Sequence, residues 1–264
     1  MSHADAPFAL LPGVEESPVI LHVPHSAREI PPNVRAGILL DDTELGRELD
    51  HITDAHTDVL AGLAATTATV TPWRFVNRLS RLVIDPERFP DEREEMLAVG
   101  MGAVYTRTTH RGALRSADID PRPLIGRYFH PYARAMTAAV AGRLAATGRA
   151  VVIDVHSYPT ARLPYELHGD GPRPPVCLGT DSFHTPPELL DRARDLFAES
   201  GGTEVDSPFP GTYVPLAYHG TEARVAALMV EIRRDTYMTE PGGTAGPGIT
   251  RIASALAALV DAVS

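Results

Sequence analysis

The sequence has 264 residues, of which 44% are hydrophobic and 22% are charged, and its formal net charge is −10. These values are typical of a globular protein that can bury a sizeable core. The acidic balance argues against a nucleic acid or an anionic membrane as a partner, because both bind basic surfaces.

The cysteine count and the N-terminal segment together predict a cytoplasmic location. One cysteine, Cys177, allows neither an intrachain disulfide nor a zinc site built from several thiolates, which suits a reducing compartment. The opening segment MSHADAPFALLPG lacks the basic start and the apolar core of a secretory signal. Apolar runs stay well short of the roughly 20 residues that a membrane-spanning helix needs. We therefore expect neither secretion nor membrane insertion.

Predicted strands and helices alternate along the chain. Strands are indicated by short runs of β-branched and apolar residues, and helices by apolar residues at helical spacing with proline or glycine at the ends. In chain order, the elements are a strand at 18–23, a helix at 41–65, strands at 67–71 and 81–85, a helix at 130–148, strands at 150–155 and 175–178, a helix at 186–202, strands at 212–216 and 225–232, and a helix at 249–262. This alternation predicts an α/β fold of three layers, with helices on both faces of a mixed central sheet.

The proline- and glycine-rich segments at 158–175, 207–220 and 240–247 are predicted to be surface loops rather than domain linkers. Too few residues flank any of them to form a second hydrophobic core. We therefore expect a single domain over residues 1–264.

Two histidines follow apolar strands directly. VILHVPHSAR (19–28) carries His25, and VVIDVHSYPT (151–160) carries His156. In an open α/β sheet, sites gather at the carboxyl ends of the strands. Neutral imidazole is the commonest metal ligand, and two histidines with one carboxylate are a usual zinc-binding set. The pattern therefore predicts a metal site that contains both histidines.

The third ligand of such a site is expected to be a carboxylate. Asp50 and Asp54 lie four residues apart in the predicted helix 41–65, and therefore on one face. That spacing alone fits a solvent-exposed surface as well as a site. Glu29 is a further carboxylate near His25, although its use would require a tight local loop. The residues by themselves leave the choice open.

Arginines are concentrated in FVNRLSRLVIDPER (75–88), which includes Arg81 and Arg88. Guanidinium groups bind carboxylates through two parallel hydrogen bonds, so these arginines would suit an acidic substrate. The alternative is surface ion pairing, which is the commoner role of a single arginine.

The apolar segment ALMVEIRRDTYM (227–238) places Glu231 and Arg233 on the same face of a predicted strand. Charged groups inside such a strand are costly unless they are paired or used in chemistry. They could form a buried ion pair. Alternatively, Glu231 could serve as the general base of a metal-dependent hydrolase.

Taken in order, these motifs resemble the N-formylglutamate amidohydrolase family. The resemblance covers about residues 18–240 and consists of VPHSAREIPP, Asp54, SRLVIDPER, DVHSYP, LGTD, PFPGTYV and VEIRRDTYM. It implies a zinc-carboxypeptidase-like fold, also similar to aspartoacylase, in which a mixed sheet of about eight strands lies between helices and holds zinc at strand ends.

The resemblance also implies roles for individual residues. Asp54 is preferred to Asp50 because it aligns with an aspartate that the family keeps. The implied set is a Zn²⁺ ion held by His25, Asp54 and His156, Glu231 as general base, and Arg81, Arg88 and Arg233 as candidate ligands of substrate carboxylates. This chain departs from the related patterns at Glu87, where the family usually has asparagine, and at Arg28, where the carboxypeptidases have the glutamate of His-x-x-Glu.

The function implied is zinc-dependent hydrolysis of a small N-acyl amino acid. N-formyl-L-glutamate, cleaved to formate and glutamate in histidine degradation, is the expected substrate. The first alternative is a deacylase or carboxypeptidase-like amidase that acts on another N-acyl amino acid. The second alternative is a metal-binding protein of the same fold without catalytic activity.

Overall fold

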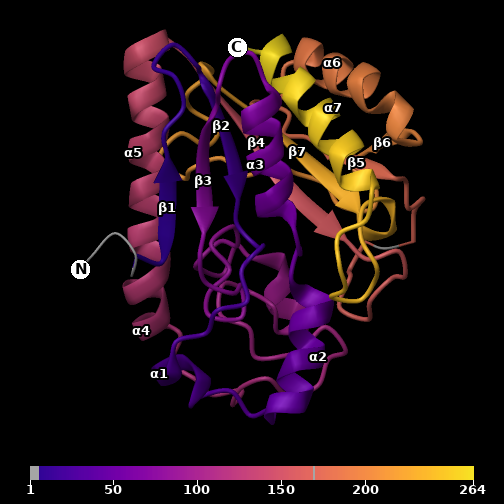
Figure 1. Ribbon diagram of the computed structural model, residues 1–264. Helices are drawn as coiled ribbons and strands as arrows, with labels where there is room; N and C mark the ends of the chain where they lie inside the picture. The colour runs from indigo at the N-terminus through magenta and orange to yellow at the C-terminus, as the bar shows by residue number, and fades with distance from the viewer. Residues whose placement is uncertain (1–5, 169) are drawn as a thin grey trace.

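Seven strands form one mixed sheet at the centre of the computed structural model, which describes residues 6–168 and 170–264 (Figure 1). The strands are β1 (Phe8–Leu11), β2 (Val19–Val23), β3 (Trp73–Asn77), β4 (Ala150–Tyr158), β5 (Val176–Gly179), β6 (Thr203–Val205) and β7 (Val225–Arg233). Their order across the sheet is β1-β3-β2-β4-β7-β5-β6. Strands β3, β2, β4 and β7 are parallel to one another, whereas β1 pairs antiparallel with β3, and β5 antiparallel with β7. The predicted mixed sheet is confirmed.

Helices cover both faces of this sheet (Figure 1). The helices are α1 (Pro32–Arg35), α2 (Asp42–Ile52), α3 (Thr57–Thr67), α4 (Arg122–Leu124), α5 (His130–Thr147), α6 (Pro187–Phe197) and α7 (Gly248–Ala262). Helices α3, α6 and α7 pack on one face and α5 on the other. None of the described helices is both long enough and apolar enough to cross a membrane.

The alternation of side chains along the inner strands decides which face each residue occupies. In β4, Val151, Ile153 and Val155 belong to the core under α3, α6 and α7. The intervening Asp154 and His156 therefore lie on the opposite face, the one that α5 covers. Alternation in β7 places Glu231 on that same face, since Val230 and Ile232 belong to the first core. The polar residues of these two strands thus share one side of the sheet, near its carboxyl edge.

The chain's only cysteine lies next to this group. Cys177 in β5 is directly opposite Glu231 in the antiparallel pairing with β7. The side chain of Cys177 is completely buried, and burial raises the pKa of its thiol to about 12.

The predicted helix 41–65 is two helices, because the chain leaves the helical conformation at residues 53–56. Thr53 is extended, and His56 has a left-handed backbone with φ of 67°. The backbone N–H of Asp54 donates to the carbonyl oxygen of His25 at 3.0 Å instead of continuing the helix. The break joins the start of α3 to the loop that follows β2.

Three predicted strands are wrong, and three strands were missed. The segment 67–71 belongs to the end of α3 and the turn after it, where Thr69 and Val70 donate their N–H groups to the carboxylate of Asp261. In 81–85 the apolar residues are buried within turns, so burial alone produced the strand-like pattern. The segment 212–216 is likewise outside the sheet. The missed strands are β1 and β6, which are the short edges of the sheet, and the inner strand β3.

Candidate metal centre

The loop after β2, the break between α2 and α3, and the end of β4 bring three predicted ligands to one point. The Nδ1 atom of His156 lies 3.0 Å from Oδ2 of Asp54 and 3.3 Å from Nδ1 of His25. The remaining distance, from Nδ1 of His25 to Oδ2 of Asp54, is 3.7 Å. Ligands about 2.0–2.1 Å from a tetrahedral zinc ion are roughly 3.3 Å apart, so these three atoms fit such an ion. All three side chains are buried.

Each histidine is oriented by a carboxylate on its far side. Nε2 of His25 lies 3.0 Å from Oδ1 of Asp85, and Nε2 of His156 lies 3.1 Å from Oδ1 of Asp154. With Nδ1 directed at the centre, the Nε2–H of His25 can donate to Asp85, and the Nε2–H of His156 lies between Asp154 and Oε1 of Glu87, to which it is hydrogen-bonded at 3.3 Å. Carboxylate acceptors on the far nitrogen are usual for metal-binding histidines. Arg81 holds Asp85 in turn, with Nη2 at 2.7 Å.

Asp154 is fixed by groups from two other segments. The Nδ1 atom of His22 lies 2.8 Å from Oδ1 of Asp154, and the backbone N–H of Tyr213 donates to Oδ2 at 3.2 Å. The latter bond explains why the segment around Tyr213 does not join the sheet, because its backbone serves a side chain instead. The far nitrogen of His22 contacts the hydroxyl of Tyr132 from α5 at 2.5 Å.

Replacing Asp85 with asparagine is expected to weaken metal binding about 10- to 100-fold, because the His25 ring loses its charged acceptor. The measurement is competition for zinc against a chelator of known affinity, with circular dichroism to verify folding. Asp50→Asn removes the same charge at the surface and is the control. An unchanged affinity in folded Asp85→Asn protein would contradict the arrangement.

Asp54 is anchored by Arg234, which is not among the residues predicted from the sequence. Nη2 of Arg234 lies 3.3 Å from Oδ1 of Asp54, and Nη1 donates to the carbonyl oxygen of His51 at 2.6 Å. The strand ends at Arg233, and the short 3₁₀ turn Arg234–Thr236 directs Arg234 toward the centre. Strict alternation along the strand would instead have favoured Arg233.

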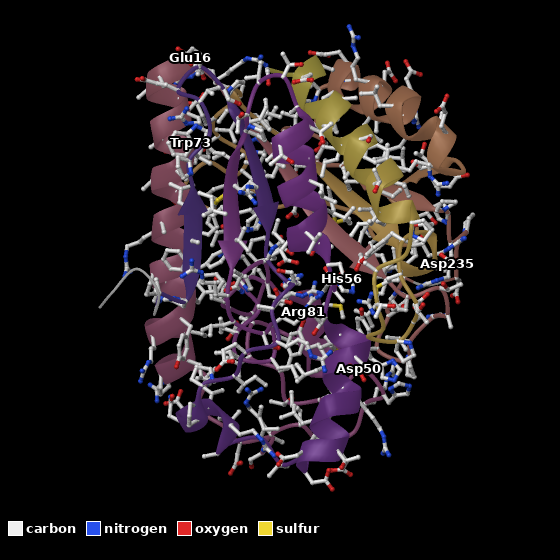
Figure 2. The ribbon with its side chains drawn as sticks, in the orientation of Figure 1. Glu16, Asp50, His56, Trp73, Arg81 and Asp235 are labelled. Atoms are coloured by element: carbon white, nitrogen blue, oxygen red, sulfur yellow. The ribbon has the colours of Figure 1, made fainter. Side chains whose placement is uncertain are left out.

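Arg233 itself is not brought to the centre. Its Nε donates to Asp235 at 2.8 Å, and Figure 2 shows Asp235 at the right-hand side of the view, away from Arg81. Asp50, the other candidate carboxylate, is also elsewhere, paired with Arg28 at 2.7 Å on the surface. The expectation that Asp50 and Asp54 share a helix face is wrong, because α2 ends at Ile52.

The electrostatics of the cluster favour a positive charge. Burial alone would lower the pKa of His156, but the carboxylates of Asp154 and Glu87 outweigh it and raise that pKa well above its usual value. The pKa of His25 is also raised: burial and Arg81 act against the shift, but Asp85 and Glu87 outweigh them. Carboxylates that stabilise a proton on two buried imidazoles would equally stabilise a bound cation, which would displace those protons.

Glu231 lies buried beside this cluster, on the wall of a cavity. Its Oε2 atom has no hydrogen-bond partner among the described residues. Burial, with a smaller contribution from the negative charge of Asp54, raises the pKa of Glu231 to about 8. Burying a carboxylate oxygen without a hydrogen-bond partner destabilises the folded state, so such a group is expected to have a functional role. This geometry therefore favours Glu231 as a proton acceptor rather than as a structural residue.

The cavity has a volume of about 480 Å³ and opens onto the centre. Its charged and histidine lining residues are His25, Arg81, Glu87, Arg88, Arg93, Glu94, Glu95, Asp154, His156, Glu166, His168 and Glu231. Arg81 is engaged by Asp85 and by the Tyr105 hydroxyl at 3.0 Å. Arg88 is held more loosely: its Nε atom lies 3.6 Å from Asp85 and its Nη1 atom 3.7 Å from Glu94, and Nε has no hydrogen-bond partner in the described part of the chain. Of the predicted arginines, Arg88 is therefore the best placed to bind a substrate carboxylate.

Comparisons with known proteins were made for the whole chain. A family model described as N-formylglutamate amidohydrolase matches residues 17–238. The crystal structure of N-formylglutamate amidohydrolase from Ralstonia eutropha JMP134 aligns with a TM-score of 0.80 at 23% identity, covering 98% of this chain and 97% of that one. The gene product Atu2144 from Agrobacterium tumefaciens aligns with a TM-score of 0.73 at 19% identity, covering 100% and 97%.

A metallo-carboxypeptidase from Burkholderia cenocepacia aligns with a TM-score of 0.37 at 14% identity, covering 97% of this chain and 60% of that one. Among curated proteins, none matches the chain. The likeness to the first two structures, both below 25% identity, shows a shared fold.

Proposed function

The chain belongs to the N-formylglutamate amidohydrolase family, and from this premise we propose that it hydrolyses the amide C–N bond of a small N-acyl amino acid with a divalent cation. The proposal rests on the convergence of His25, Asp54 and His156 at distances that suit one ion, beside the unpartnered carboxylate of Glu231. Two nitrogens and one carboxylate oxygen are a donor set that suits zinc.

A zinc ion held by these three residues would polarise the acyl carbonyl and lower the pKa of water to about 7. Glu231 accepts the proton of the attacking water and passes it to the nitrogen of the leaving amine as the C–N bond breaks. Because burial raises the pKa of Glu231 to about 8, its protonated form is stable enough to carry that proton between the two steps. Arg88 binds the substrate carboxylate and so holds the amide near the centre.

For N-formyl-L-glutamate, the substrate in the family's name, the products are formate and glutamate. Glu87 favours a second candidate, a deacylase for a different N-acyl amino acid, because it adds a carboxylate to the cavity wall beside the centre. Both candidates use the same residues and the same chemistry.

We expect the purified protein to contain zinc and to hydrolyse N-formyl amino acids faster than the N-acetyl or N-formimidoyl derivatives. Metal analysis and a hydrolysis screen over these three series are the measurements. Turnover is expected to disappear on chelation and to return when zinc is added. Metal-loaded protein that hydrolyses none of the compounds would contradict the proposal and favour a non-catalytic metal-binding protein.

A further inference from the structure

Glu87 presents a carboxylate to the candidate metal centre from the cavity wall. Its Oε2 atom lies 3.2 Å from Nε2 of His156 and 3.7 Å from Nδ1 of His25, while Oε1 lies 3.5 Å from Nδ1 of His22. The backbone N–H of Glu87 donates to Oδ1 of Asp85 at 3.2 Å, which fixes the start of the side chain. The side chain is 16% exposed, so it is largely desolvated but open to the cavity.

The histidines around Glu87 do not neutralise it when a cation occupies the centre. His25 and His156 must then be uncharged, because their Nδ1 lone pairs bind the ion. Nε2 of His156 is hydrogen-bonded to Oε1 of Glu87 at 3.3 Å and lies 3.1 Å from Oδ1 of Asp154, but an uncharged imidazole that donates a hydrogen bond does not cancel the charge of a carboxylate. Nδ1 of His22 contacts Asp154 at 2.8 Å. The carboxylate of Glu87 thus faces the space where a substrate binds.

Cations that could bind a substrate are scarce in this cavity. The sequence contains no lysine, and the guanidinium groups in the described lining belong to Arg81, Arg88 and Arg93. Arg81 is engaged by Asp85. Arg93 is 63% exposed and donates two side-chain hydrogen bonds to Asp91, at 2.7 and 2.8 Å. Arg88 has only longer ion pairs, from Nε to Asp85 at 3.6 Å and from Nη1 to Glu94 at 3.7 Å, so of the three it is the one left to bind a carboxylate.

Arg88 follows Glu87 in the chain, and both line the cavity. A substrate whose amide lies at the centre and whose carboxylate is bound by Arg88 therefore passes Glu87, and its side chain branches from the carbon between those two groups. A second carboxylate on a short side chain would come within several ångströms of Glu87, and no further guanidinium group of the described lining is left to pair with it. A carboxamide, amine or guanidine there could donate a hydrogen bond to Glu87 instead.

On the basis of the proposed function, we infer that Glu87 selects the side chain of the substrate. The cavity takes N-formyl amino acids that have one carboxylate and a hydrogen-bond-donating side chain, in preference to dicarboxylates such as N-formylglutamate. At an effective dielectric constant of about 20, the repulsion between two like charges roughly 6 Å apart is large enough to lower kcat/KM about 10- to 100-fold. A neutral side chain at the same position does not experience this repulsion.

N-formylglutamine and N-formylglutamate form a matched pair for the test, because they are nearly isosteric and differ in charge. We expect the wild-type kcat/KM to be higher for N-formylglutamine by at least about tenfold. Glu87→Gln should bring the ratio of the two kcat/KM values close to one, mainly by improving N-formylglutamate. Glu92→Gln removes the same charge from an exposed position outside the cavity lining and should leave the ratio unchanged.

A binding measurement accompanies the kinetics. Calorimetric titration of the zinc-loaded protein with glutamine and with glutamate should give tighter binding of glutamine, and Glu87→Gln should reduce that difference. Equal or better use of N-formylglutamate by the wild type, or a ratio that Glu87→Gln leaves unchanged, would overturn the inference. Hydrolysis of neither compound would count against the proposed function, while the calorimetric comparison would still decide the role of Glu87.

Discussion

Replacing Glu231 with glutamine is expected to lower kcat by about 10²- to 10⁴-fold, the range that a positioned general base contributes. Glutamine keeps the size of the side chain and can still accept a hydrogen bond, but it cannot take a proton from water at neutral pH. Steady-state kinetics on the best substrate of the screen measure the effect. Because Glu231 is not among the three residues at the centre, the variant should retain its zinc.

Bound zinc in an inactive Glu231→Gln protein would separate loss of the base from loss of the metal site. Full activity in that variant would contradict the assignment of Glu231 as base. The most direct rival, Glu87, would then have to be considered, since it is a cavity carboxylate that contacts both His25 and His156.

In the absence of metal, Glu231→Gln is also expected to change how the free energy of unfolding depends on pH. Burial raises the pKa of Glu231 from 4.5 to about 8, so the folded state favours the neutral acid. The stability that this preference contributes is fully present below about pH 4.5 and is lost as the pH rises through about 8. Glutamine is neutral throughout, so metal-free Glu231→Gln should exceed metal-free wild type in free energy of unfolding, by a margin that grows with pH. Urea titrations at acidic and mildly alkaline pH would reveal a constant margin if this were wrong.

Replacing His156 with glutamine is expected to remove the bound metal and the activity together. The imidazole supplies one of three ligand atoms, and its loss leaves Asp54 and His25 alone at the centre. The affinity for zinc should therefore fall by more than the roughly 10- to 100-fold expected for the outer carboxylate Asp85. Metal analysis after gel filtration, with hydrolysis of the same substrate, is the measurement.

His130→Ala serves as the matched control for His156→Gln, because His130 is an exposed histidine at the start of α5. It should keep both zinc and activity. Stoichiometric zinc in folded His156→Gln protein would show that the ion binds elsewhere, for example at the neighbouring group of His22, Glu87 and Asp154.

His25 and His156 could be found from the sequence because His25 closely follows a buried apolar strand, His156 lies near the end of another, and both patterns are local. The strands themselves are marked by Val19–Val23 and by the nine buried residues of β4. Parallel neighbours bring such strand ends together, so two local patterns were enough to predict one site. The edge strands β1 and β6 escaped prediction because they are short and partly exposed, which leaves a weak apolar pattern.

The carboxylate ligand could not be chosen by periodicity. Asp54 lies in a break between two helices, and that break is stabilised by a hydrogen bond to His25, a residue distant in the sequence. Arg233, which was predicted to belong to the site, lies outside it for a similar reason. Strand β7 ends where a 3₁₀ turn begins, and Arg234 rather than Arg233 points toward the centre. Both features depend on tertiary contacts, which a hydrophobic pattern does not contain.

Because Cys177 lies directly across from Glu231, the reactivity of the chain's single thiol can be used to detect separation of β5 from β7. A fully buried thiol with a pKa of about 12 is protected from alkylating reagents while β5 stays paired with β7. Its rate of labelling would therefore report how often these two strands separate next to the proposed base.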